Sequence, residues 1–89
     1  MDKKEGYIEK LIITIKDKKT SDILRDDMIT AGVPKIDLRV RLDKENKNYN
    51  LTIYNAQNNL GKIITMFQNE EYGLSIPEIE ELLNIKITM

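Results

Sequence analysis

Apolar and polar residues alternate along several short stretches of this chain, which is the pattern of half-buried β-strands. The clearest stretch covers residues 36–43, where every second residue from Ile36 to Leu42 is apolar and the others are charged. A second stretch covers residues 49–54, and the polar residues 44–48 between them have the length of a hairpin loop. The two stretches therefore predict an antiparallel β-hairpin.

The beginning and the end of the chain alternate in the same way. Residues 7–16 predict a first strand with leucine or isoleucine at every second position, and only Ile12 interrupts the polar side. Residues 85–89 predict a short terminal strand. The alternation does not decide whether this terminal strand pairs within its own chain or with a second copy. If two copies exchanged their terminal strands, each would need the other to complete its sheet, and the dimer would be obligate.

Between the strands, the apolar spacing changes to that of amphipathic helices. A first helix is predicted from an N-cap at Thr20 or Ser21 to about Ala31. Gly32 stands where a left-handed C-cap is favoured, and Pro34 prevents the helix from continuing.

A second helix is predicted after Asn55, which can act as its N-cap. Gly61 inside this helix costs about 1 kcal/mol relative to alanine, and we expect a close approach of the helix to the sheet to offset that cost. Gly73 ends the helix, and Ser75 with Glu78 forms a capping box that begins a short third helix.

The predicted order β-α-β-β-α-α-β resembles the ferredoxin-like split-βαβ fold, with one extra helix before the last strand. In that topology both main helices lie on one face of a four-stranded antiparallel sheet. The sequence thus predicts a single small α+β domain over residues 1–89, with the second sheet face open.

A rival interpretation rests on residues 60–89. They resemble the opening two helices of a winged-helix DNA-binding domain, through the turn Gly73-Leu74-Ser75-Ile76-Pro77-Glu78-Ile79. The helix that follows this turn carries three glutamates, which would repel phosphate. The split-βαβ interpretation is therefore the stronger one.

Composition narrows the possible functions. The 89 residues include 14 Lys and Arg against 15 Asp and Glu, so the net charge of −1 gives no long-range attraction to nucleic acid or to a membrane. No stretch approaches the roughly 20 apolar residues that span a bilayer, and residues 1–5 are not followed by a signal-peptide core. The chain has no cysteine, which fits a reducing compartment, and we expect a cytoplasmic protein without membrane partners.

Few residues are suited to catalysis, because the chain has neither histidine nor cysteine. Asp22 and Asp26 share a helix face and could hold Mg²⁺, but a solvated helix surface beside Arg25 is the simpler interpretation. Residues 43–48 superficially resemble a calcium loop without its central glycine and terminal glutamate. We expect no enzyme, no cofactor and no metal site.

The open sheet face is the remaining candidate for a binding site, because it combines basic residues with one aromatic and one apolar side chain. The predicted partner-binding residues are Lys10, Ile12, Lys16, Arg39, Arg41 and Tyr54. Asp37 and Asp43 are expected on the same face, while the C-terminal third of the chain is rich in glutamate. A near-neutral total charge therefore conceals a basic face and an acidic edge.

Several uses of this face remain open. It can be solvated or form a homodimer, or it can bind another protein, since arginine and tyrosine are common at interfaces. It can also bind nucleic acid through the phosphate backbone, with Tyr54 as the one stacking residue. RNA recognition motifs use the same face, but they stack bases on several aromatics that this chain lacks.

We therefore expect a non-catalytic binding protein that docks on another macromolecule through the open sheet face. It would be a small regulatory or inhibitory protein, of the kind that phages and mobile elements encode, and would self-associate as a homodimer. A nucleic-acid-binding module that uses the basic sheet face is the alternative.

Overall fold

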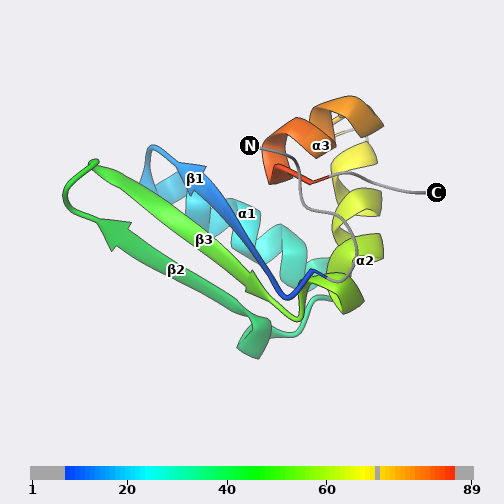
Figure 1. Ribbon diagram of the computed structural model, residues 1–89, viewed down its shortest axis with the longest axis horizontal. Helices are drawn as coiled ribbons and strands as arrows, with labels where there is room; N and C mark the ends of the chain where they lie inside the picture. The colour runs from blue at the N-terminus through cyan, green and yellow to red at the C-terminus, as the bar shows by residue number, and fades with distance from the viewer. Residues whose placement is uncertain (1–7, 70, 86–89) are drawn as a thin grey trace.

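The computed structural model describes residues 8–69 and 71–85 of the chain. Its sheet has three antiparallel strands in the spatial order β1-β3-β2, which are β1 (Lys10–Ile15), β2 (Leu38–Asp43) and β3 (Asn48–Tyr54). Its helices are α1 (Lys18–Thr30), α2 (Ala56–Gln68) and α3 (Ile76–Leu83), and a short 3-10 turn, η1 (Lys35–Asp37), precedes β2 (Figure 1). The predicted α+β class and the antiparallel hairpin are confirmed.

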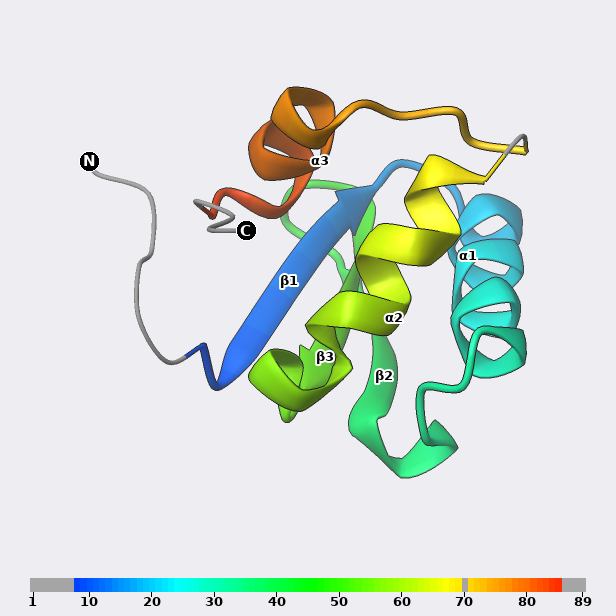
Figure 2. The same cartoon turned by 90° about the vertical axis from the view of Figure 1, so that its right-hand side faces the viewer.

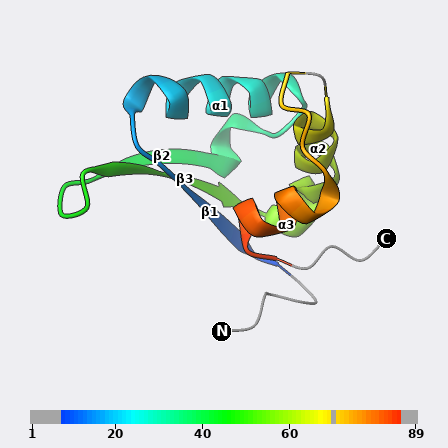
Figure 3. The same ribbon diagram turned by 90° about the horizontal axis from the view of Figure 1, so that it is seen from above.

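The helices α1 and α2 lie on the same side of the sheet, and α3 lies beside β1 (Figures 2 and 3). The helix α1 contacts all three strands, while α2 and α3 contact each other and β1. Fully buried side chains from every layer meet between them; they include Met28, Leu51, Ile53, Ile63, Phe67 and Ile79. No helix formed by residues 8–69 or 71–85 covers the sheet face away from α1 and α2.

The strand order is compatible with a split-βαβ arrangement, but the ferredoxin-like topology requires a fourth strand. That strand was predicted at residues 85–89, of which residues 86–89 lie outside the described part of the chain. Ile85 is fully buried directly after α3, and its amide donates to the Glu80 carbonyl at 3.1 Å. The complete topology stays a prediction.

The first predicted strand is confirmed by its burial. Residues of β1 are alternately exposed and buried, with Leu11, Ile13 and Ile15 facing the helices. Ile12 and Thr14 face the opposite way. This is the period of two that a pleated strand imposes on its side chains.

The predicted start of the second strand is wrong. Alternation in the sequence continues back to Ile36, but residues 35–37 form η1 after Pro34, and β2 begins only at Leu38. As a result Ile36, expected in the core, is 88% exposed, and Asp37, expected on the open face, is buried. Leu42, also expected in the core, is 52% exposed at the hairpin end of β2.

Asp37 is held by two asparagines at the start of α2. The Nδ2 of Asn55 donates to its Oδ1 at 3.0 Å, and the Nδ2 of Asn59 donates to its Oδ2 at 3.1 Å. The same Asn59 nitrogen donates to the Tyr54 carbonyl, also at 3.1 Å. This Asp37 cluster ties the beginning of β2 to the junction between β3 and α2.

The predicted N-cap of α1, the predicted capping bond of Asn55 and one predicted packing contact are wrong, whereas the predicted start of α2 directly after Asn55 is confirmed. Helix α1 begins three or four residues earlier than predicted, because the Asp17 side chain accepts from the Thr20 amide at 2.8 Å. Asn55 precedes α2 in a left-handed conformation, with φ of 50°, and its side chain makes no capping bond. A Cβ added to Gly61 would meet nothing within 4 Å, so this glycine permits no close approach to the sheet.

Two other helix boundaries are confirmed. Gly32 follows α1 with φ of 108°, a conformation that glycine adopts at little cost. Ser75 and Glu78 form both bonds of the capping box of α3.

We predict that Asp37→Ala destabilises the protein, because it leaves the buried amide of Asn59 without its carboxylate acceptor. The expected loss is about 1–3 kcal/mol in the free energy of unfolding, measured by chemical denaturation. Asp26→Ala is the matched control, since that carboxylate side chain is 71% exposed and should change stability by no more than about 0.5 kcal/mol. Equal effects of the two changes would contradict a stabilising role for the Asp37 cluster.

Candidate functional site

The register of the sheet arranges the open face in rows that cross all three strands. Ile12 on β1 lies opposite Thr52 on β3, and Thr52 lies opposite Arg39 on β2. The next row contains Thr14, Asn50 and Arg41. Lys10 and Tyr54 form a further pair at one end. We call these eight residues the sheet face: Lys10, Ile12, Thr14, Arg39, Arg41, Asn50, Thr52 and Tyr54.

The middle of the sheet face is partly apolar. Ile12 is 49% exposed and Tyr54 is 38% exposed, although both are large hydrophobic side chains. Thr52 between Ile12 and Arg39 is buried by its neighbours on the sheet itself. Beside it, the Thr14 hydroxyl donates to Asn50 Oδ1 at 3.3 Å. The Thr14 and Asn50 side chains thus bond to each other, and the exposed side chains of Ile12 and Tyr54 lie on the same face.

Basic side chains stand at the borders of this apolar centre. Lys10, Arg39 and Arg41 are all exposed. In the described part of the chain, the ion pairs are those of Lys18 with Asp22 and Arg25 with Asp26, both on α1. No acidic side chain of residues 8–69 or 71–85 therefore neutralises the three cations of the sheet face.

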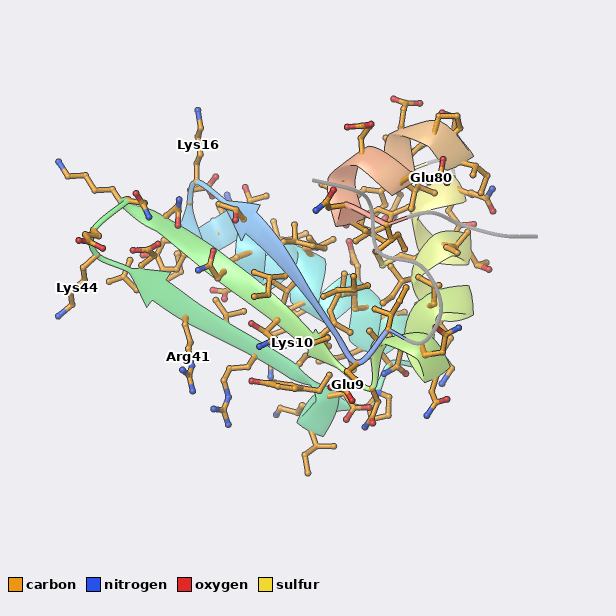
Figure 4. The ribbon with its side chains drawn as sticks, viewed as in Figure 1. Glu9, Lys10, Lys16, Arg41, Lys44 and Glu80 are labelled. Atoms are coloured by element: carbon orange, nitrogen blue, oxygen red, sulfur yellow. The ribbon has the colours of Figure 1, made fainter. Side chains whose placement is uncertain are left out.

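The structure brings five of the six predicted binding residues together and separates the sixth. Lys16 lies one residue beyond β1, and its side chain points away from the sheet (Figure 4). It lines a shallow hollow at the hairpin end of the sheet, shared with Leu42, Lys44 and Tyr49. Lys10, Ile12, Arg39, Arg41 and Tyr54 remain on the sheet face.

The carboxylates of α1 are occupied by neighbours. Asp22 Oδ2 accepts from Lys18 Nζ at 2.8 Å, and Asp26 lies 3.7 Å from Arg25. Within residues 8–69 and 71–85, no group of three or more acidic side chains is arranged to hold a metal ion. These contacts favour the interpretation of a solvated helix surface for the Asp22 and Asp26 pair.

A hollow lies between the C-terminal ends of α1 and α2, and the contacts of its lining residues have a structural role. Its volume is about 570 Å³, and Asp27 and Tyr72 are among its lining residues. The Tyr72 hydroxyl donates to Asp27 Oδ2 at 2.5 Å, and the Tyr72 ring packs edge-on against Phe67 at 5.3 Å. Burial, followed by the bond to Asp27, raises the pKa of the Tyr72 phenol. Tyr72 therefore fastens the segment after α2 to α1.

Leu42 is, like Ile36, an exposed residue that the sequence pattern places in the core. Its alternation with Arg41 and Asp43 indicates a core position, but the end of a hairpin can extend beyond the helix that covers it. Figure 3 shows the β2–β3 loop reaching past the start of α1. The polar run 44–48, which predicts a hairpin loop, is the available signal for such an overhang.

We predict that the sheet face can be changed without loss of the fold. Ile12→Ala should cost less than about 1 kcal/mol of unfolding free energy, because the side chain is half exposed. Ile13→Ala, one residue along the same strand, should cost about 2–4 kcal/mol, because Ile13 is buried under the helices. Chemical denaturation compares the two variants. A cost for Ile12→Ala equal to that of Ile13→Ala would mean that the face is covered in the folded protein.

Comparison of the chain with protein-family models, curated proteins and solved structures finds no match. None of the helices formed by the described residues has the length and apolar character needed to cross a membrane. The chemistry of the sheet face is therefore the basis for assigning a function.

Proposed function

We propose that the protein is a non-catalytic binding protein, regulatory or inhibitory in role, that docks its sheet face on an acidic protein surface. The observation that carries the proposal is the exposed pair Ile12 and Tyr54 on an uncovered sheet, bordered by the cations of Lys10, Arg39 and Arg41. The cytoplasmic location expected from the sequence remains part of this proposal.

The composition of the sheet face matches that of a protein interface. Interface cores are apolar and enriched in aromatic residues and arginine, and their borders are polar. Tyrosine and arginine are also common among the few residues that supply most of the binding energy. On this sheet face, Ile12 and Tyr54 supply the apolar and aromatic centre. Arg39 and Arg41 supply the arginines.

A sheet also reduces the cost of binding. The backbone of the sheet face is fixed on both sides of β3 by hydrogen bonds to β1 and β2. The Tyr54 carbonyl is additionally held by Asn59. Less conformational entropy is lost when a fixed backbone binds, so a larger part of the interaction energy appears as affinity.

The charge of the face indicates the chemistry of the partner. Lys10, Arg39 and Arg41 form no ion pair with an acidic side chain of residues 8–69 or 71–85. Aspartate and glutamate on a partner would match these three cations, and such charge complementarity speeds encounter and disfavours basic surfaces. The net charge of the whole chain is −1, so this attraction is local to the face and does not act on every acidic protein.

The test is photo-cross-linking in an extract of the native cells, with a photoreactive residue in place of Thr14, an exposed position on the β1 side of the face. We expect a cross-link to a defined protein that disappears when Arg39→Ala, Arg41→Ala and Tyr54→Ala are combined. These changes remove two charges and one aromatic anchor, for which losses of about 2 kcal/mol or more each are typical at hot spots.

A matched control removes two cations and one exposed apolar residue outside the sheet face, through Lys19→Ala, Lys35→Ala and Ile36→Ala. All three positions are exposed, and Ile36 is 88% exposed. This variant should keep the cross-link. Retention of the cross-link by the sheet-face variant, or its loss in the control, would refute docking through this face.

Nucleic-acid binding is the second candidate, favoured by the combination of Tyr54 with the exposed cations Lys10, Arg39 and Arg41 on one face. If Lys10, Arg39 and Arg41 neutralise about three phosphates, affinity should fall roughly fortyfold between 50 and 200 mM salt. Fluorescence anisotropy with labelled single-stranded RNA and duplex DNA measures this, with Lys10→Ala as the variant that lowers the salt dependence. No binding at 50 mM salt would exclude this candidate.

A further inference from the structure

The strand β2 has a free edge. It pairs with β3 along its whole length, from Leu38 opposite Ile53 to Asp43 opposite Asn48. In the part of the chain that the structure describes, no strand pairs with its other side (Figure 1). The register has no bulge and the strand has no proline. Such an edge presents unpaired backbone groups to any extended strand of matching length.

The free backbone groups can be assigned by alternation. The Leu38 amide donates to the Lys35 carbonyl within η1, so Leu38 is not hydrogen-bonded to β3 through that amide. Because neighbouring residues of an antiparallel strand point their backbone groups to opposite sides, Val40 and Leu42 direct theirs to the free edge. Arg39, Arg41 and Asp43 direct theirs to β3.

We propose that two copies of this chain associate by antiparallel pairing of β2 with β2 of the second copy, around a two-fold axis at Leu42. The side chain of Arg41 on each copy then lies opposite Asp43 of the other. The proposal concerns the edge of the sheet, and it does not rest on the sheet face being a docking site.

Charge selects this register. A two-fold axis at Val40 would place Arg39 opposite Arg41 twice, and an axis at Arg41 would place the two Arg41 residues against each other. Like charges directly opposite destabilise a strand pair, and opposite charges stabilise it. The axis at Leu42 avoids both clashes and creates two Arg41–Asp43 pairs.

The position of η1 at one end of β2 also favours a two-fold axis at Leu42 over one at Val40. An axis at Val40 would bring the hairpin turn after Asp43 against η1 of the other copy, since residues 37 and 43 would then lie opposite each other. With the axis at Leu42, the overlap is centred on the hairpin end, away from η1. Leu42 is 52% exposed, and pairing would place the two Leu42 side chains together on the same face.

The side chains that would meet are suitably placed. Arg41 extends beyond the free edge of β2, away from β3 (Figure 4). The Asp43 carboxylate accepts from the amide and the Nδ2 of Asn46, at 3.2 and 2.8 Å. These bonds hold the pKa of Asp43 below its usual value, so the carboxylate is ionised at neutral pH.

The experiment is a charge exchange between two variants, Arg41→Asp and Asp43→Arg, measured by size-exclusion chromatography with light scattering. We expect the wild type to reach twice the 10.4 kDa of one chain as its concentration rises. Each variant alone would place like charges opposite each other and should remain monomeric. An equal mixture restores both opposite-charge pairs and should form the dimer again.

A second pair of variants covers the case in which Asp43→Arg does not fold, since it removes the bonds to Asn46. Leu42→Lys should give a monomer, whereas Ile36→Lys, which adds the same charge at an exposed position in η1, should leave the dimer intact. Circular dichroism verifies that each variant is folded. A monomeric wild type at millimolar concentration, a dimeric Leu42→Lys, or a folded mixture that stays monomeric would overturn the proposal.

Discussion

The pairing of β3 with a strand on each side is the constraint on which the rest of the structure depends. Leu51 and Ile53 of β3 are completely buried, and Thr52 between them points to the open face. Because side chains alternate strictly along a strand, a shift of one residue in either pairing would exchange the buried and the open side chains. The register with β1 and β2 therefore fixes both the core under α1 and the composition of the sheet face.

The Asp37 cluster determines where this pairing ends. By binding Asn55 and Asn59, the Asp37 side chain holds η1 against the turn from β3 into α2. β2 consequently starts at Leu38, and its six residues are those that present Arg39 and Arg41. Burying a carboxylate costs folding free energy unless the carboxylate is hydrogen-bonded. Few other backbone arrangements would give the Asp37 carboxylate its two hydrogen bonds, so the Asp37 cluster favours this arrangement over alternatives.

Alternation in the sequence was sufficient to predict the hairpin, the first strand and most of the sheet face. It failed at Ile36 and Asp37, because a 3-10 turn after Pro34 continues the apolar spacing without continuing the strand. The start of α1 was missed because Asp17, Thr20 and Ser21 are all good N-caps, and only the three-dimensional structure shows that Asp17 accepts from the Thr20 amide.

The candidate site was less predictable than the fold. The side of the sheet on which a residue lies follows from its position in a strand, so Lys10, Ile12, Arg39, Arg41 and Tyr54 were placed together correctly. Lys16 follows the same alternation but lies beyond the last paired residue of β1. The exposure of Leu42 depends on where α1 begins relative to the hairpin. That is a property of tertiary packing, and the spacing of apolar residues along the sequence does not predict it.

The connection between the strands has a consequence for the order of folding. β2 and β3 are joined by a short turn, and a hairpin of this kind closes in roughly 1–10 μs. β1 must instead meet residues such as Asn50, 36 positions away from Thr14, and longer loops close at a greater entropic cost. Until β1 arrives, the hairpin has two open edges, and the edge of β3 is the one that β1 later covers. The newly synthesised chain therefore passes through an interval in which a foreign strand can compete with its own β1.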